Sequence, residues 1–145
     1  MHRVQSRHLS RAERFALYGV TGWAMEIVFT ALTDNRDRKL QGHTYLWMLP
    51  IYGLTALLFD PVHARVAEQN VAARAAAYAA SFIAVEYASG KLLRRLTGVC
   101  PWDYTGRSRF VIDGVTRLDY APLWAAAGLG VEHLDRLFDR IRVAT

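Results

Sequence analysis

Two acidic side chains stand alone in long apolar stretches of this 145-residue chain. Glu26 is the only Asp, Glu, Lys or Arg between positions 15 and 33, and Glu86 is the only one between positions 75 and 90. A carboxylate is costly in an apolar medium unless it is neutral, paired or beside water. If the two carboxyl groups met, they would hold a proton or a cation between them. The alternative is that each is a hydrogen-bonded residue that joins helices.

Helical spacing predicts which residues accompany these acids. Steps of three and four residues place Gly19, Gly22, Trp23, Glu26 and Thr30 on one helical face. On a later helix, Tyr78 and Phe82 share the face of Glu86. The opposite face carries an alanine at every fourth position: Ala72, Ala76, Ala80, Ala84 and Ala88. This stripe of small residues predicts a seam along which a second helix approaches closely.

Polar groups outside the apolar stretches gather beside turn-forming residues. They occur at Gly42-His43-Thr44 and in the run from Cys100 to Tyr104, which suggests a lid over the acids. His43, Asp103 and Tyr104 have the chemistry of an acid or base at headgroup depth. Two simpler readings stay open: Trp102 and Tyr104 belong to an interfacial aromatic belt, or His43 is a hydrogen-bond partner.

Several kinds of site lack support in the sequence. The single cysteine, Cys100, forms neither an internal disulfide nor a zinc site alone, and no histidine spacing suggests a metal. Phosphate-binding loops, nucleophile elbows and zinc-finger spacings are absent, and no cofactor is indicated. The formal charge of +5 and pI near 9.7 are better explained by lipid headgroups than by nucleic acid.

The elements that must position these residues are four predicted helices near 15–32, 43–60, 70–94 and 119–141. The mean hydropathy of +0.06 is low because charged connections, among them 34–39, separate apolar stretches. The last helix is expected to pass from membrane into an amphipathic tail. The predicted fold class is all-α: a polytopic helical membrane protein with about four transmembrane helices and an amphipathic C-terminal helix, in a single domain of residues 1–145.

A soluble four-helix bundle is the competing architecture, because the apolar part of the fourth helix is short. The membrane interpretation is favoured because residues 40–59 are apolar on all sides and contain Trp47, Pro50 and Gly53. Basic residues do not orient the chain, since nine fall on each side of a four-span topology.

The motifs as a set resemble a known family. Gly22-Trp23 with Glu26, Gly42-His43-Thr44, the Pro50–Gly53 block, Glu86 with the Ser89–Leu93 block, the Cys100–Tyr104 block and the Arg117–Trp124 block are similar, in order, to the transmembrane protein 229 family. They also resemble the broader bacterial ABC-transporter type IV (CmpB-like) membrane protein family. This chain departs from that group in having Asp113-Gly114, where the group often has asparagine. The resemblance implies a multi-pass helical membrane protein and supplies no catalytic residues.

Three functional classes follow: a carrier or permease-like protein that binds a small or lipid-like ligand, a membrane enzyme acting on lipid, and a scaffold or accessory subunit. The expected location is the cell or inner membrane. The expected partners are membrane lipids and either a second copy or another membrane subunit. The candidate residues for ligand binding or a polar cavity are Trp23, Glu26, His43, Tyr52, Glu86, Trp102, Asp103, Tyr104 and Asp113.

Overall fold

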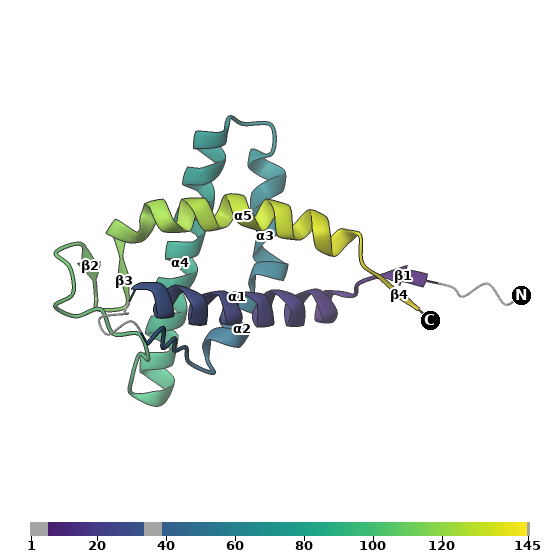
Figure 1. The fold of residues 1–145 in the computed structure, drawn as a ribbon. Helices are drawn as coiled ribbons and strands as arrows, with labels where there is room; N and C mark the ends of the chain where they lie inside the picture. The colour runs from purple at the N-terminus through teal and green to yellow at the C-terminus, as the bar shows by residue number, and fades with distance from the viewer. Residues whose placement is uncertain (1–5, 34–38, 145) are drawn as a thin grey trace, which may run out of the picture. The chain divides into compact units, whose positions relative to one another are not determined.

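The computed structural model describes residues 6–33 and 39–144, and most of them are helical. The helices are α1 (Arg11–Thr33), α2 (Met48–Gly53), α3 (Thr55–Val66), α4 (Val71–Thr97) and α5 (Ala121–Asp139), with a 3-10 turn at Leu118–Tyr120 (Figure 1). The strands are β1 (Ser6–His8), β2 (Val111–Ile112), β3 (Thr116–Arg117) and β4 (Arg142–Ala144). Most of the connection expected at 34–39 lies outside the described residues.

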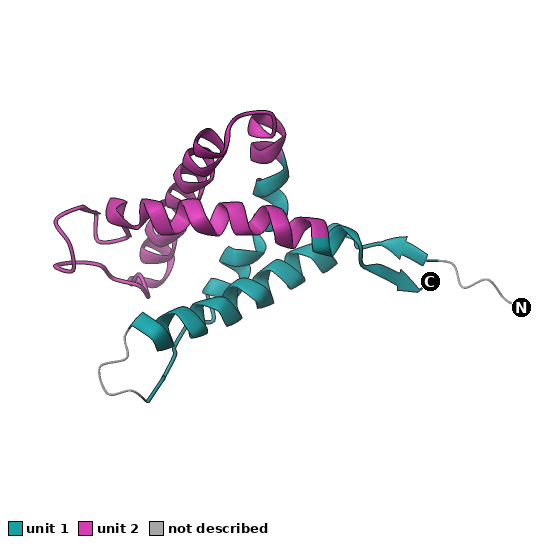
Figure 2. Ribbon diagram, turned by 45° about the horizontal axis from the view of Figure 1, so that its top comes forward, with its two compact units in different colours: residues 1–60, 137–145 teal, residues 61–136 magenta. Residues whose placement is uncertain are grey.

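The chain divides into two compact units (Figure 2). The first contains residues 1–60 and 137–145, and the second contains residues 61–136. The expected single domain over residues 1–145 stays a prediction.

In the first unit, a capping box starts α1. The Ser10 amide donates to Glu13 Oε2 at 2.7 Å, and the Glu13 amide donates to Ser10 Oγ at 3.3 Å. Arg7 donates to both oxygens of the same carboxylate at 2.6 and 2.9 Å. These contacts satisfy amide groups at the helix start, so α1 begins at Arg11 rather than at residue 15.

The two ends of the described chain form a small sheet in the first unit. Strands β1 and β4 are antiparallel and pair Arg7 with Val143. Nearby, Arg14 forms an ion pair with Asp139 at 2.6 Å, and the rings of Tyr18 and Phe138 pack edge-on. The sequence did not predict this sheet, and the expected helical tail to residue 141 ends at Asp139 instead.

The helix expected at 43–60 is wrong in its bounds. Residues 43–47 precede α2, and the helical path is divided at Leu54 between α2 and α3. The backbone of Leu54 stays helical, and its amide lies near the carbonyl groups of both Pro50 and Ile51. The break is therefore a local tightening of hydrogen bonding rather than a reversal of the chain.

In the second unit, α4 is the longest helix, and both of its ends are capped. The Asn70 side chain accepts a hydrogen bond from the Ala73 amide, and Gly98 ends the helix in the left-handed region with φ 82°. The buried face carries Tyr78, Glu86 and Leu93. The opposite alanine stripe is exposed at all five positions, so no described helix of the second unit packs along the predicted seam.

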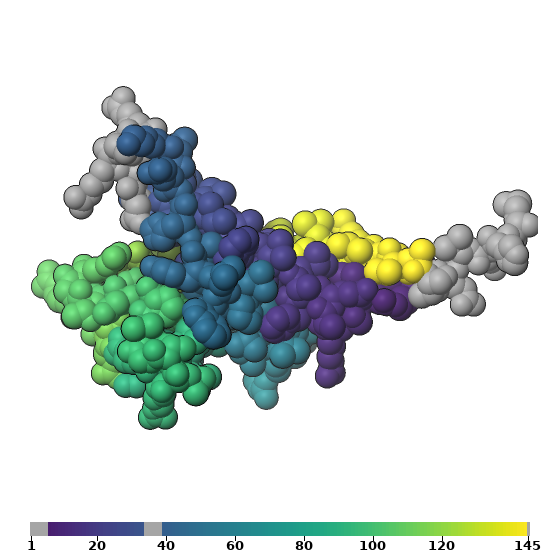
Figure 3. Space-filling view, turned by 90° about the horizontal axis from the view of Figure 1, so that it is seen from below, coloured from purple at the N-terminus to yellow at the C-terminus, as the bar shows by residue number. Residues whose placement is uncertain are grey.

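Glycine rather than alanine permits the close packing within the second unit. A Cβ atom added to Gly128 of α5 would lie 2.2 Å from Tyr78 Cβ of α4. A Cβ atom added to Gly90 would lie 2.9 Å from Val115 Cβ in the loop that follows α4. That loop contains the β2–β3 hairpin, and it lies with the end of α4 on the surface drawn in green in Figure 3.

The expectation of four transmembrane helices is not supported. Among the described helices, only α1 is long and apolar enough to cross a membrane, judged by length and composition. Helix α3 has 12 residues and contains Pro61. Helix α4 contains Arg74, Glu86 and Lys91, which lower its mean hydropathy, and α5 carries Glu132, Asp135 and Arg136 in its second half.

Candidate functional site

The polar face of α1 packs on the segment 42–53 of the first unit, as the three- and four-residue spacing predicts. Gly22 makes room for this contact, because an added Cβ atom would lie 2.5 Å from Tyr52 Cγ. The Trp23 indole donates to the Tyr45 carbonyl at 3.1 Å. At the far end, the Thr30 hydroxyl accepts a hydrogen bond from the His43 amide at 2.8 Å.

Glu26 lies in the middle of this contact. The Thr44 hydroxyl donates to Glu26 Oε2 at 2.6 Å, and Tyr52 also hydrogen-bonds to the carboxyl group. His43 is near enough to interact electrostatically with Glu26. Four of the nine candidate residues, Trp23, Glu26, His43 and Tyr52, are therefore brought together in the first unit, and the sequence missed the role of Thr44.

In the second unit, Glu86 is buried, and both of its carboxyl oxygens are hydrogen-bonded. Glu86 Oε1 accepts from the Tyr104 hydroxyl at 3.0 Å, and Oε2 accepts a short hydrogen bond from the Thr116 hydroxyl. Thr116 has no exposed surface, and it was not among the predicted site residues. These hydroxyl groups donate hydrogen bonds to the carboxyl group without adding a formal positive charge.

Two pairs of aromatic rings involve residues near Glu86 in the sequence or in contact with it. Phe82, one turn before Glu86 on α4, packs edge-on against Trp124 with ring centroids 5.8 Å apart. Tyr120, one turn before Trp124, packs edge-on against Tyr104 at 5.9 Å. The Trp124 Nε1 atom is buried and has no hydrogen-bond partner among the described residues. We call Phe82, Glu86, Tyr104, Thr116, Tyr120 and Trp124 the Glu86 cluster.

The loop that supplies Tyr104 and Thr116 is fastened to α4 through Asp113. Its carboxylate accepts hydrogen bonds from Lys91 Nζ at 3.0 Å and from the Tyr87 hydroxyl at 2.8 Å. Its carbonyl accepts from Arg94 at 2.7 Å. The hydrogen bonds from Lys91 and Tyr87 lower the pKa of Asp113 below its ordinary value. Asp113 is thus a latch for the loop, and the structure does not place it at the Glu86 carboxyl group.

Asp103 and Trp102 shape the same loop. Asp103 Oδ1 accepts from the amide and the hydroxyl of Thr105 at 2.9 and 2.6 Å, which lowers the pKa of Asp103. The buried Trp102 indole donates to the Val115 carbonyl at 3.0 Å. These contacts give both residues a local folding role, and Tyr104 between Asp103 and Thr105 is the side chain that reaches Glu86.

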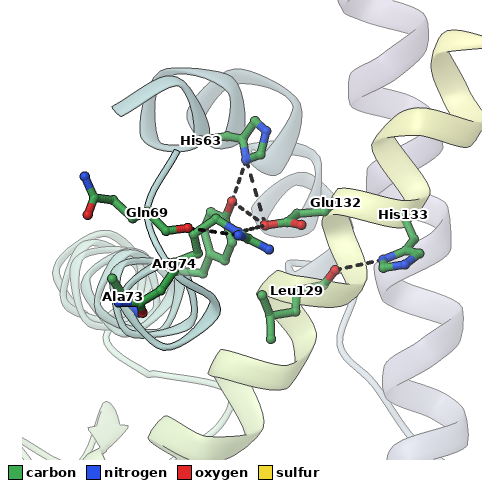
Figure 4. A network of polar contacts seen from close by, with 9 residues as sticks. His63, Gln69, Ala73, Arg74, Leu129, Glu132 and His133 are labelled. Carbon is green, nitrogen blue, oxygen red and sulfur yellow. Dashed lines mark hydrogen bonds and ion pairs between the residues drawn. The ribbon is translucent and has the colours of Figure 1, made fainter. Parts of the chain in front are cut away.

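A second buried glutamate, Glu132, lies in the helix whose C-terminal part was predicted to be an amphipathic tail. Glu132 Oε1 accepts hydrogen bonds from Arg74 Nε and from the Tyr78 hydroxyl, each at 2.9 Å (Figure 4). The Tyr78 hydroxyl lies 2.5 Å from His63 Nδ1. The network joins α3, α4 and α5 of the second unit. Its one signal in the sequence is the lone charge of Arg74 near the start of an apolar stretch.

Of the nine candidate residues, four lie together in the first unit and two, Glu86 and Tyr104, contact each other in the second, while Trp102, Asp103 and Asp113 shape the loop that carries Tyr104. The idea that Glu26 and Glu86 share one cavity stays a prediction. One shallow apolar hollow among the described residues lies on α1, with a lining of Val20, Thr21, Ala24, Met25, Val28 and Phe29. Among the described residues, no group of three or more His, Cys, Asp or Glu side chains is arranged to hold a metal ion.

The described residues are mostly helical and include one helix that is long and apolar enough to cross a membrane, which is compatible with a membrane-associated protein. Comparison with known families agrees, because residues 14–139 match the family described as "Putative ABC-transporter type IV". The chain belongs to this family. No solved structure matches the chain.

Proposed function

We propose that this protein is an integral membrane protein that crosses the bilayer more than once and binds or carries a small polar or lipid-like solute at the Glu86 cluster. The observation that supports the proposal is the buried Glu86 carboxyl group, held by two hydroxyl groups and flanked by aromatic rings. The order of sequence blocks further supports a narrower kinship with the transmembrane protein 229 family.

The cluster suggests the chemistry of its ligand. Glu86 suits a proton, a cation or an N–H or O–H donor, whereas the unpartnered Trp124 Nε1 atom suits a hydrogen-bond acceptor. The rings of Phe82, Tyr104 and Tyr120 add apolar surface, and the Arg117 guanidinium already lies 4.1 Å from the centroid of the Tyr120 ring. A small solute with an apolar body and polar groups is therefore the proposed ligand.

Exposed apolar side chains support a location in the bilayer. On α1, Val20, Met25, Val28 and Leu32 are each more than half exposed. Outside α1, Leu46 is 79% exposed and Leu96 is 72% exposed. So much apolar surface is unfavourable in water and is ordinary for a chain covered by lipid.

The functional test compares Glu86→Gln with Glu68→Gln, an exposed glutamate of the same unit. We expect native mass spectrometry of the purified proteins to find a co-purified solute on the wild type and on Glu68→Gln. The solute should be lost from Glu86→Gln, whose amide cannot accept a proton or pair with a cation. Trp124→Phe should weaken binding less, because it removes one hydrogen bond.

Two outcomes would contradict this part of the proposal. If Glu86→Gln keeps the solute and its full pH dependence between about pH 5 and about pH 9, Glu86 only joins helices. If a bound lipid is instead chemically altered by the wild type, the protein is an enzyme.

The topology test uses carbonate extraction and single cysteines. Release by carbonate would favour a soluble bundle. In a Cys100→Ser background, we expect Gln69→Cys and Arg107→Cys to react with a membrane-impermeant maleimide from opposite sides, because α4 lies between them. If both cysteines are labelled from one side, α4 does not cross the bilayer, and any crossing segments lie elsewhere in the chain.

A further inference from the structure

The end of α4 and the loop at 98–118 carry a concentration of positive charge. Residues 91–118 contain six basic and two acidic side chains, in a chain whose formal net charge is +5. We infer that this part of the second unit, seen in green in Figure 3, docks on the anionic phospholipid headgroups of the membrane. The inference rests on the membrane location proposed above and adds the lipid class and the contact surface.

The basic residues divide into two groups by their contacts. Lys91, Arg94 and Arg117 make hydrogen bonds or ion pairs to Asp113 or Asp119. By contrast, the charged groups of Arg95, Arg107 and Arg109 make no hydrogen bond or ion pair with residues that the structure describes. All three are exposed. The second group is therefore available to phosphate oxygens.

Exposed apolar side chains accompany these three arginines. Leu96 follows Arg95 directly and is 72% exposed, while Phe110 follows Arg109 and is 52% exposed. The Arg109 guanidinium lies 5.7 Å from the centroid of the Phe110 ring. Basic side chains beside apolar ones match the boundary between headgroups and acyl chains, where both kinds of group find partners.

Hydrogen bonds within the second unit order this loop in the absence of lipid. The Asp113 latch ties it to α4, and the Leu118 amide donates to the Phe110 carbonyl at 3.0 Å. Arg107 is the last residue of a tight turn, and its amide donates to the Tyr104 carbonyl at 2.9 Å. Little backbone entropy is then lost on docking, which favours a specific surface over a chain that folds on contact.

A bilayer fits this surface better than a soluble anion. Inorganic phosphate would neutralise the arginines but would leave Leu96 and Phe110 in water. A leaflet containing phosphatidylglycerol supplies negative charge and an apolar layer together. The surface is therefore assigned to lipid, and free phosphate becomes a control.

The test titrates the full-length protein in detergent with phosphatidylglycerol, phosphatidylcholine or inorganic phosphate and follows the melting temperature. We expect phosphatidylglycerol to stabilise the wild type at lower concentration than phosphatidylcholine, and phosphate to have no effect. The double variant Arg107→Gln/Arg109→Gln should raise the phosphatidylglycerol concentration needed by about 30-fold. The control Arg65→Gln/Arg136→Gln removes equal charge from exposed sites on α3 and α5 and should behave as wild type.

A third variant separates charge from apolar contact. Phe110→Ser should weaken stabilisation by both lipids equally, because acyl contact does not depend on headgroup charge. Equal responses of the wild type to both lipids, or to phosphate, would overturn the inference while leaving the proposed solute site intact. Release by carbonate with the arginine effect retained would instead overturn the integral location and keep the surface as a peripheral one.

Discussion

Glu86 and Glu132 are both buried in the second unit, each 8% exposed, yet they have different surroundings. Glu132 is paired with the Arg74 guanidinium, whereas Glu86 accepts hydrogen bonds from the hydroxyl groups of Tyr104 and Thr116. An arginine adds a positive charge beside its partner and holds helices together. A hydroxyl group holds a carboxyl group in place without adding a formal charge. Burial alone therefore does not distinguish these two acids, whereas the chemistry of their hydrogen-bond donors does.

The largest expected effect comes from removing the partner of Glu132. Arg74→Met should lower the free energy of unfolding by about 3 kcal/mol, because it leaves a buried charge without its cation. The measurement is unfolding in mixed detergent micelles. The double variant Arg74→Met/Glu132→Met should regain most of the loss. A double variant as unstable as the single one would mean that the pair acts through packing alone.

Removing the charge of each glutamate sharpens the contrast. Glu132→Gln should cost about 2 kcal/mol, because Arg74 loses a charged acceptor. Glu86→Gln should cost less than about 1 kcal/mol, since the amide oxygen still accepts a hydrogen bond from a hydroxyl group. The same unfolding assay compares the two. Equal losses would show that Glu86 is held as tightly as Glu132.

Removing each of the two hydroxyl groups that hydrogen-bond to Glu86 should lower stability by a different amount, because Thr116 and Tyr104 differ in burial. Thr116→Val should cost about 1–2 kcal/mol, because Thr116 is fully buried and water cannot replace its hydroxyl group. Tyr104→Phe should cost about 1 kcal/mol or less, since Tyr104 is half-buried. Melting curves of both variants test this order, and a larger cost for Tyr104→Phe would reverse it.

The smallest effect concerns the Asp113 latch and depends on pH. Its pKa is lowered below the ordinary 3.8 by hydrogen bonds from Lys91 and Tyr87. A lowered pKa means that the contribution of Asp113 is present above pH 3.8 and is lost as pH falls through the folded-state value. Asp113→Asn should therefore be slightly less stable than wild type at neutral pH and equal to it in acid. Asparagine suits the positive φ of 53° here, so the backbone should not change.

Hydrogen exchange of amides at 100–118 provides the second readout for the latch. Exchange in Asp113→Asn should be faster at neutral pH, because the loop is released from α4. If exchange rises throughout the second unit instead, the substitution has acted on the whole unit.

Sequence spacing predicted which residues share a helix face, but it predicted few of the contacts between residues that are distant in the sequence. The face of α1 that carries Gly22, Trp23 and Glu26 follows from the helical repeat, and so does the face that Tyr78 and Glu86 share on α4. The alanine stripe failed because a repeat shows which residues share a face and not which face is packed. Contacts between distant residues, such as Arg74 with Glu132, leave no local signal.

The hairpin at 111–117 was missed for a related reason. Its strands have two residues each, too short for an alternating pattern, and its turn depends on the positive φ values of Asp113 and Gly114. Thr116 faces Glu86 only because that turn has formed. Thr116, two residues after Gly114, therefore looks ordinary in the sequence.

The β1–β4 sheet constrains how the chain can be threaded through a bilayer. Residues 6–8 are hydrogen-bonded to residues 142–144, so both must lie on the same side. Between two points on one side, a chain makes an even number of crossings. A lone passage by α1 would separate the strands, so a chain that spans with this sheet intact must return through a second segment between Thr33 and Arg142.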